Sequence, residues 1–227
     1  MQPFLRTVLA LLTLTCLACA GGGGSSPSGT TPAPAVTDLY LGGYEENAAG
    51  IEVAKVWKNG VATALTDGTH YARVKGLAAV GADVYAVGYQ DNGAFWVATL
   101  WKNGVATPLS DGTSDAQAIG VAVAGADIHV VGYVNNGSGS PAATTWKNGV
   151  RTQIPGGIGW AYGVTVAGGS VYIAGNQYNS SGISVAVLWK DGLRTELSSG
   201  TSSAVANAVR VSGAEVRVAG TENGPNN

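Results

Sequence analysis

Residues able to carry out catalysis are scarce in this chain of 227 residues. It contains two histidines, His70 and His129, and two cysteines, Cys16 and Cys19. Nucleophilic catalysis of the Ser-His-Asp or Cys-His type requires a histidine within hydrogen-bond reach of the nucleophile. A zinc site usually requires three or four His or Cys ligands. We therefore expect no catalytic constellation, no metal site and no cofactor.

The positions of the repeated aspartates indicate a role in turns and not in catalysis or metal binding. Asp67 and Asp111 each begin an Asp-Gly-Thr triplet, and the third copy of this triplet begins with Ser199 in place of the acid. A turn that survives without its carboxylate is better explained by local hydrogen bonds than by calcium binding. One enzyme class stays open as an alternative, a carbohydrate hydrolase, which needs two Asp or Glu side chains about 5–9.5 Å apart.

An internal repeat organises the elements that would position any site. Trp-Lys-Asn-Gly, with Asp for Asn in the last copy, begins at Trp57, Trp101, Trp146 and Trp189, at spacings of 44, 45 and 43 residues. A second marker, a short alternating stretch, begins at residues 38, 83, 127, 170 and 215. A residue kept at one position of every copy fills the same packing position each time, so we expect the four tryptophans to be structural.

Each repeat is predicted to form four short strands. In one copy these are residues 116–124, 127–133, 142–147 and 150–154, here named the first to fourth strands. The Asn-Gly or Asp-Gly pair between the third and fourth strands favours a type I′ turn, in which both residues have positive φ. Four-stranded antiparallel units with a period of about 40 to 45 residues are typical of the blades of a β-propeller.

The predicted fold class is therefore all-β, a β-propeller of about four four-stranded blades that is closed, open or truncated. The repeat domain spans residues 38–227, with repeats at about 38–82, 83–126, 127–169 and 170–214 and a partial repeat at 215–227. The chain opens on a second strand and closes on a first and a second strand. A fourth blade would form if the C-terminal first strand joined the N-terminal three strands, a closure that hides sheet edges.

Composition and charge exclude several classes of protein. Hydrophobic residues make up 45% of the chain, which is too many for a disordered protein. The 35 glycines and the scarcity of charged residues, 11% of the chain, fit strands and tight turns better than helical bundles. The net charge of -2 lacks the basic excess of a nucleic-acid-binding protein, so we expect no nucleic-acid partner.

The N-terminus predicts export. Residues 1–18 have the dimensions of a signal peptide, and residues 19–37 have the Gly, Ser, Thr and Pro content of a flexible tether. Cys-Leu-Ala-Cys resembles the cleavage and lipidation site of bacterial lipoproteins. The resemblance implies that Cys19 carries a lipid and, through Ala20, that the protein is exported to an outer membrane. An ordinary secretory signal is the alternative.

The repeats resemble the HAF family of probable extracellular repeats, whose unit carries Ala-x-x-Trp-x-Asn-Gly followed by Leu. The resemblance extends from Leu39 to Gly220 and lacks the His-Ala-Phe triplet that names the family. It implies an exported bacterial protein with no assigned chemistry. The matching segments are residues 54–60, 98–104, 143–149 and 186–192, followed by Leu65, Leu109, Ile154 and Leu197.

Residues that break the repeat are the best candidates for a binding site, because packing does not demand them. In a propeller, the loops from second to third strand and from fourth to first strand emerge on one face, and there the copies differ. Aromatic side chains among amides and acids suit sugars or peptides. The candidate ligand-binding residues are Tyr71, Asp91, Trp160, Tyr162 and Tyr178, with Arg73, Lys75, Gln117 and Asn207 at the same mouth.

Together these features predict an exported, lipid-anchored binding or scaffolding module of the bacterial cell envelope, at the outer membrane or cell surface. The expected partner is a glycan or an envelope protein, and the N-terminal lipid provides the contact with the membrane. Two alternatives remain, a carbohydrate-active hydrolase on a propeller and a shortened remnant of a larger repeat protein.

Overall fold

The computed structural model describes residues 38–224, and all regular elements in this range are β-strands that pair antiparallel. This confirms the all-β prediction. The predicted signal peptide, Cys19 and the whole tether (residues 19–37) lie outside the described residues, as do residues 225–227 of the repeat domain. No helix in residues 38–224 is long and apolar enough to cross a membrane.

The strands fall into five successive units, numbered along the chain. Unit 1 consists of β1 (Tyr40–Glu46), β2 (Glu52–Lys58) and β3 (Val61–Ala64). Unit 2 consists of β4 (Ala72–Val80), β5 (Asp83–Asp91), β6 (Trp96–Lys102) and β7 (Val105–Pro108). Unit 3 consists of β8 (Ala116–Ala124), β9 (Asp127–Asn135), β10 (Pro141–Lys147) and the beginning of β11 (Val150–Ala167). Unit 4 consists of the rest of β11 with β12 (Ser170–Tyr178), β13 (Ser184–Lys190) and β14 (Leu193–Glu196). Unit 5 consists of β15 (Ala204–Ser212) and β16 (Glu215–Glu222).

The turns between third and fourth strands have the predicted geometry. Asn59, Asn103, Asn148 and Asp191 have φ of 51–52°, and the glycine after each has φ of 82–84°. The side chain of the turn residue also ties neighbouring strands together. In unit 2, for example, Asn103 Oδ1 accepts the Val84 amide proton at 2.8 Å and Asn103 Nδ2 donates to Asp83 at 2.7 Å. The Asn-Gly turn is thus part of the hydrogen bonding of the sheet as well as a reversal of the chain.

Units 3 and 4 share one continuous strand, which the sequence did not indicate. Because β11 is both the fourth strand of unit 3 and the first strand of unit 4, the two units form a single seven-stranded sheet in the order β14-β13-β12-β11-β10-β9-β8. The connection here is two residues shorter than elsewhere: Ile154 and Gly159 are five positions apart, whereas Leu109 and Ala116 are seven apart. The short segment passes through Gly156 and Gly157, both with positive φ, without a separate loop.

A β-bulge interrupts the pairing of every first strand with its second strand. The register shifts at Val74/Gly76, Ala118/Gly120, Ala161/Gly163 and Ala206/Ala208. A glycine of the second strand lies opposite each bulge because the carbonyl of the first strand comes too close for a Cβ. A Cβ at Gly88 would be 1.8 Å from the Arg73 carbonyl oxygen, and one at Gly132 would be 1.9 Å from that of Gln117.

The tryptophans of units 2 to 4 are buried against the preceding unit. Trp101 packs with Ala54 and Leu65 of unit 1, and Trp146 packs with Leu109 of unit 2. Trp146 Nε1 also donates a hydrogen bond of 2.7 Å to the Leu109 carbonyl. Trp189 packs in the same way with Ile154 of unit 3. Trp57, which has no preceding unit, is only half-buried.

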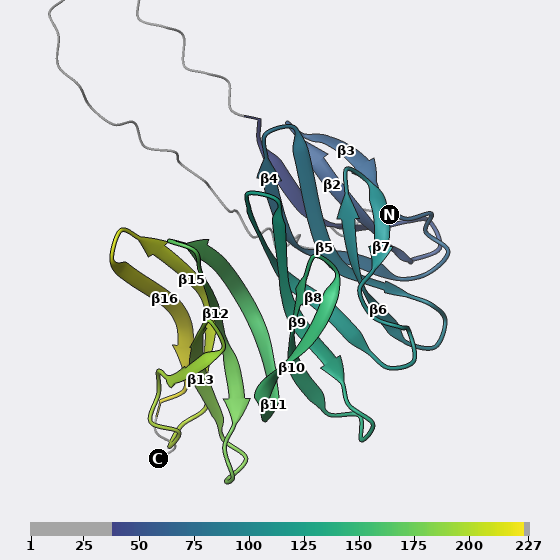
Figure 1. The fold of residues 1–227 in the computed structure, drawn as a ribbon. Coiled ribbons are helices and arrows are strands. Elements are labelled where there is room, and N and C mark those ends of the chain that lie inside the picture. The colour runs from purple at the N-terminus through teal and green to yellow at the C-terminus, as the bar shows by residue number, and fades with distance from the viewer. Residues whose placement is uncertain (1–37, 225–227) are drawn as a thin grey trace, which may run out of the picture.

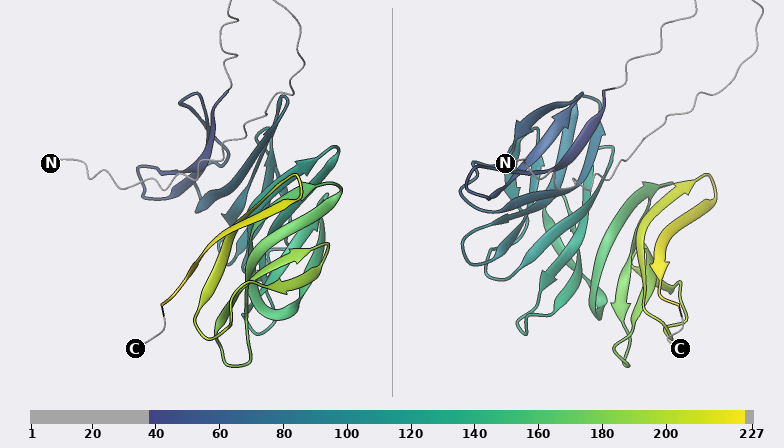
Figure 2. Two further views of the ribbon diagram at one scale, coloured as in Figure 1. Left: turned by 90° about the vertical axis from the view of Figure 1, so that its left-hand side faces the viewer. Right: turned by 180° about the vertical axis from the view of Figure 1, so that it is seen from behind.

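The units stand side by side, from the purple strands of unit 1 to the yellow hairpin of unit 5 (Figure 1). The same order is seen from the side and from behind (Figure 2). The first strands β4, β8, β11 and β15 are neighbours, and β1 lies beside β4. In residues 38–224, β15 pairs with β16 and β1 pairs with β2, so the expected joining of the C-terminal first strand to unit 1 is not seen in this molecule.

The bulge predicts where an added methyl group is harmful. We expect Gly132→Ala to lower the free energy of unfolding by about 2 kcal/mol, because the new Cβ would displace the Gln117 carbonyl. Gly137→Ala is the matched control, since a Cβ there meets nothing within 4 Å. Chemical denaturation followed by circular dichroism measures both, and equal midpoints for the two variants would contradict the close approach.

Candidate functional site

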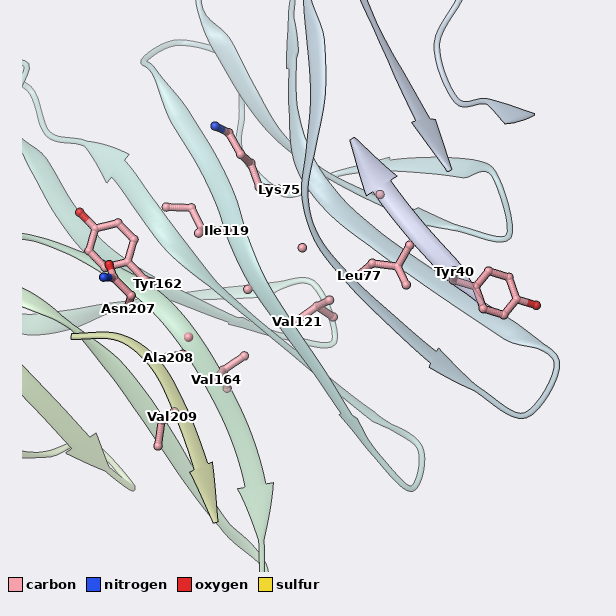
Figure 3. A pocket seen from close by; sticks show the side chains of 14 residues that line it. Tyr40, Lys75, Leu77, Ile119, Val121, Tyr162, Val164, Asn207, Ala208 and Val209 are labelled. Carbon is pink, nitrogen blue, oxygen red and sulfur yellow. The ribbon is translucent and has the colours of Figure 1, made fainter. Parts of the chain in front are cut away.

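The four bulges define a groove between the first strands. Each bulge places one extra residue on the side of the strand that faces its neighbours, as bulges do when they redirect a side chain. These residues are Lys75, Ile119, Tyr162 and Asn207, and all four line a groove of about 170 Å³. Figure 3 shows them in a row on neighbouring strands, at one end of the groove.

Small residues at the next position let the first strands approach each other closely. A Cβ at Gly76 would be 2.5 Å from the Ile119 carbonyl oxygen, and one at Gly120 would be 2.7 Å from that of Tyr162. A side chain at either position would push the strands apart and change the groove. The floor of the groove is therefore backbone and short apolar side chains, and its polar groups come from the bulges.

Three of the four bulged side chains carry hydrogen-bonding groups that no other residue of the described range engages. Within residues 38–224, no ion pair or side-chain hydrogen bond engages Lys75, Tyr162 or Asn207. Much of Lys75 is exposed, but its surroundings in the groove remove water from the ammonium group and, with the nearby Arg73, lower its pKa. Burial likewise raises the pKa of Tyr162. An ammonium, a phenol and an amide are thus available to one small polar ligand.

An aromatic cluster lies beside the groove in units 3 and 4. The rings of Tyr133 and Trp160 meet edge to face with centroids 6.3 Å apart, and those of Trp160 and Tyr178 with centroids 5.9 Å apart. Burial, and after it the charge of Asp115, raises the pKa of Tyr133 to about 12. Tyr178 is 40% exposed, so this cluster offers an aromatic face to a ligand.

The predicted ligand-binding residues lie in two groups. Trp160, Tyr162 and Tyr178 belong to unit 4, where Trp160 and Tyr178 are in contact and Tyr162 lines the groove. Tyr71 and Asp91 belong to unit 2, where the Asp91 amide donates to the Tyr71 carbonyl at 2.7 Å. The Asp91 carboxylate accepts the Gly93 amide proton at 2.8 Å and so stabilises its own turn.

Sequence reasoning missed an ion pair at the same end of the sheets. Glu52, which is buried, pairs with both Arg73 Nε and Arg73 Nη2, and the Arg73 guanidinium lies over the Tyr44 ring at 4.4 Å. Glu52 raises the pKa of Arg73. The pair joins β2 of unit 1 to β4 of unit 2. Its only signal in the sequence is that an acid and an arginine stand where other units have uncharged residues, such as Trp96 and Gln117.

Carboxylates and metal ligands are absent from the groove. None of its lining residues is Asp or Glu, so it does not supply the acid pair that the hydrolase alternative requires. In residues 38–224 no group of three or more His, Cys, Asp or Glu side chains is placed to hold a metal ion. Asp67 Oδ1 instead accepts the Thr69 amide and hydroxyl protons at 2.9 and 2.7 Å, and Asp111 does the same with Thr113.

Comparison with known proteins adds no family to this picture. No protein-family model matches the chain, and no curated protein matches it. The site is therefore interpreted from its own geometry.

The ion pair between units 1 and 2 can be tested by removing its charge. We expect Glu52→Gln to lower the free energy of unfolding by about 2 kcal/mol, because the Arg73 guanidinium keeps its partly buried position without a counter-charge. Glu196→Gln removes one charge from the exposed Arg194 pair and should change stability by less than about 0.5 kcal/mol. Urea titrations of the two variants give the comparison; equal losses would mean that the Glu52 pair is no stronger than a surface pair.

Proposed function

We propose that this protein is an exported, lipid-anchored module of the bacterial cell envelope that binds a small polar group of a glycan or an envelope protein in its axial groove. The observation that carries this proposal is the row of bulged residues. Three of them, Lys75, Tyr162 and Asn207, hold unused donors and acceptors around one groove. The repeat itself does not require these residue types, since the remaining bulge, in β8, holds Ile119.

The size of the groove sets the size of the group that it accepts. At about 170 Å³ it is smaller than the roughly 300–1,000 Å³ of pockets that enclose drug-sized ligands. It suits one sugar ring or one side chain of a larger partner, with Trp160 and Tyr178 contacting the adjoining part. A donor-rich groove beside aromatic rings is also the combination that sugars require, with hydrogen bonds to hydroxyl groups and ring faces for stacking.

For the architecture we propose a propeller-type array of the HAF kind. Support comes from five units of the same strand plan, first strands that lie side by side around one groove, and the Trp-Lys-Asn-Gly turn. For export, support comes from the sequence of residues 1–37, in which the apolar stretch ends at the Cys-Leu-Ala-Cys segment.

The anchor is tested by the mass of the N-terminal peptide. We expect the protein isolated from bacterial membranes to begin at Cys19 and to carry a diacylglyceryl group there, because the segment has the residue types of a lipoprotein cleavage site. Cys19→Ser should move the protein to the soluble fraction, whereas Cys16→Ser should leave it in the membrane. An uncleaved chain with an unmodified Cys19 would disprove the anchor.

The groove is tested by a binding screen with glycans and envelope proteins, followed by variants measured against each hit. We expect Lys75→Met, Asn207→Ala and Tyr162→Phe each to weaken binding about tenfold, since each removes one hydrogen-bonding group from the groove, a loss of about 1.4 kcal/mol. Trp160→Ala and Tyr178→Ala should weaken it further by removing the stacking face.

Lys190→Met is the matched control for charge. This lysine lies over the Tyr172 ring at 5.3 Å and does not line the groove, so its loss should leave binding unchanged. If the affinity of a hit is the same for the groove variants, the aromatic variants and the unmodified protein, the ligand binds elsewhere.

A further inference from the structure

Within residues 38–224, no contact explains why position 43 of β1 is a glycine. It occupies the position of Gly88, Gly132, Gly175 and Gly220, where the bulged first strand leaves no room for a Cβ. In the part of the chain that the structure describes, unit 1 has no first strand, and a Cβ at Gly43 would meet only the Trp57 ring, at an ordinary 3.4 Å. Its φ is not in the left-handed region either. The free edge of β1 is therefore shaped to accept a bulged first strand.

Trp57 and Leu197 are the two kinds of residue that pack together in the interfaces between units 1 to 4, but neither has its partner within one molecule's described residues. In the three internal interfaces, a buried tryptophan covers the leucine or isoleucine of the preceding unit, as Trp146 covers Leu109. Leu109 and Ile154 are 6% and 5% exposed, whereas Leu197 of unit 4 is 44% exposed, and no tryptophan of residues 38–224 packs on it. Trp57 is half-buried, and in the same range no earlier unit lies against it.

We propose that these molecules associate head to tail. Unit 1 of one copy docks on unit 4 of the next, so that Trp57 covers Leu197 and β1 pairs with β15. β15 and β1–β3 together then form one complete four-stranded unit shared by two copies. The association repeats, at the ends of the molecule, the contact that already joins its units.

The register of the new strand pair follows from the other units. In unit 2, Val74 pairs with Gly88 and Leu77 pairs with Ala86, on either side of the bulge at Lys75. The equivalent pairs between copies are Ala206 with Gly43 and Val209 with Leu41. Here β1 takes the place of β16, whose pairing with β15 is a two-stranded sheet with β16 exposed along most of its length. Isolated two-stranded pairs are marginally stable, so separating β16 from β15 requires little free energy.

A second copy fits this surface better than the same chain does. Trp101, Trp146 and Trp189 are at most 1% exposed, and these packed interfaces hold β1 and β15 on different sides of the groove. Joining the two strands within one molecule would require opening such interfaces, whereas docking a second copy leaves them intact. Because the contact uses different surfaces of the two copies, it is heterologous and can continue into a chain of molecules.

The docking surface also carries an ion pair, Lys55 with Glu45, on β2 and β1. Lys55 occupies the position of Thr99 and Thr144, which are buried between units. An ion pair that has already formed on the surface adds little to the free energy of association when an interface buries it. The cost of removing water from the charges offsets their attraction. We therefore expect this contact to be weaker than the internal ones, and reversible.

Sedimentation velocity of the full chain in a mild detergent, over a range of concentrations up to roughly 100 µM, tests the proposal. We expect species larger than the monomer whose population rises with concentration. Gly43→Ala should weaken association at least tenfold, because its Cβ would collide with the carbonyl of the incoming strand. Leu197→Gln should weaken it to a similar extent by placing an amide under the indole of Trp57.

Two variants serve as matched controls. Leu193→Gln changes a leucine that is 77% exposed at the start of β14, four residues before Leu197, and Gly137→Ala adds a methyl group in open space; both should associate as the unmodified chain does. The proposal would be overturned if the chain stayed monomeric, or if Gly43→Ala and Leu197→Gln left the population of oligomers unchanged. It would also be overturned by a monomer whose melting temperature falls on Gly43→Ala, which would mean that β1 and β15 pair within one molecule.

Discussion

Units 2, 3 and 4 are each attached to the preceding unit by one indole ring. The rings of Trp101, Trp146 and Trp189 fill the space between consecutive units, and each lies on apolar residues of the unit before it. A tryptophan buries more apolar area than other side chains, so one per interface supplies much of the contact energy between thin four-stranded units. The angle between sheets, and with it the position of each first strand, follows from this contact.

The bulges convert this regular packing into a surface with different residues at equivalent places. A regular first strand would present small side chains along its whole length, as the glycines and alanines beside the bulges do. The extra residue in each bulge is exempt from that restriction, because its side chain lines the groove and does not lie against the backbone of the next first strand. The same backbone therefore carries Lys75, Ile119, Tyr162 and Asn207 around one groove, and the repeat is preserved while its chemistry varies.

Local patterns carried most of the fold prediction. The Asn-Gly turns, the strand alternation and the period of the tryptophans all depend on residues near each other in the sequence, and the structure has the strands and turns that they indicate. Three features depend on relations between separate strands or units and could not be read in the same way. The fusion of two strands in β11 comes from a connection two residues shorter, the Arg73–Glu52 pair joins different units, and the bulges appear only in the strand registers. For the candidate site, the sequence placed Lys75, Tyr162 and Asn207 at one mouth, and all three line the groove, whereas Arg73 and Gln117, expected at the same place, do not line it. The bulges that separate the two groups could not be read from the sequence.

The continuous strand β11 also divides the molecule mechanically. Units 3 and 4 share the continuous strand β11, whose residues 150–158 pair with β10 and whose residues 159–167 pair with β12, whereas units 1, 2 and 3 are joined by loops and side-chain packing. We expect a continuous strand to resist bending more than packed side chains do, so that bending of the array concentrates on the N-terminal side of β8. Lys75 lies on that side and Tyr162 and Asn207 lie on the other. In the proposed binding role, rotation of units 1 and 2 would move the Lys75 side of the groove relative to the other side and so change the width of the group that fits.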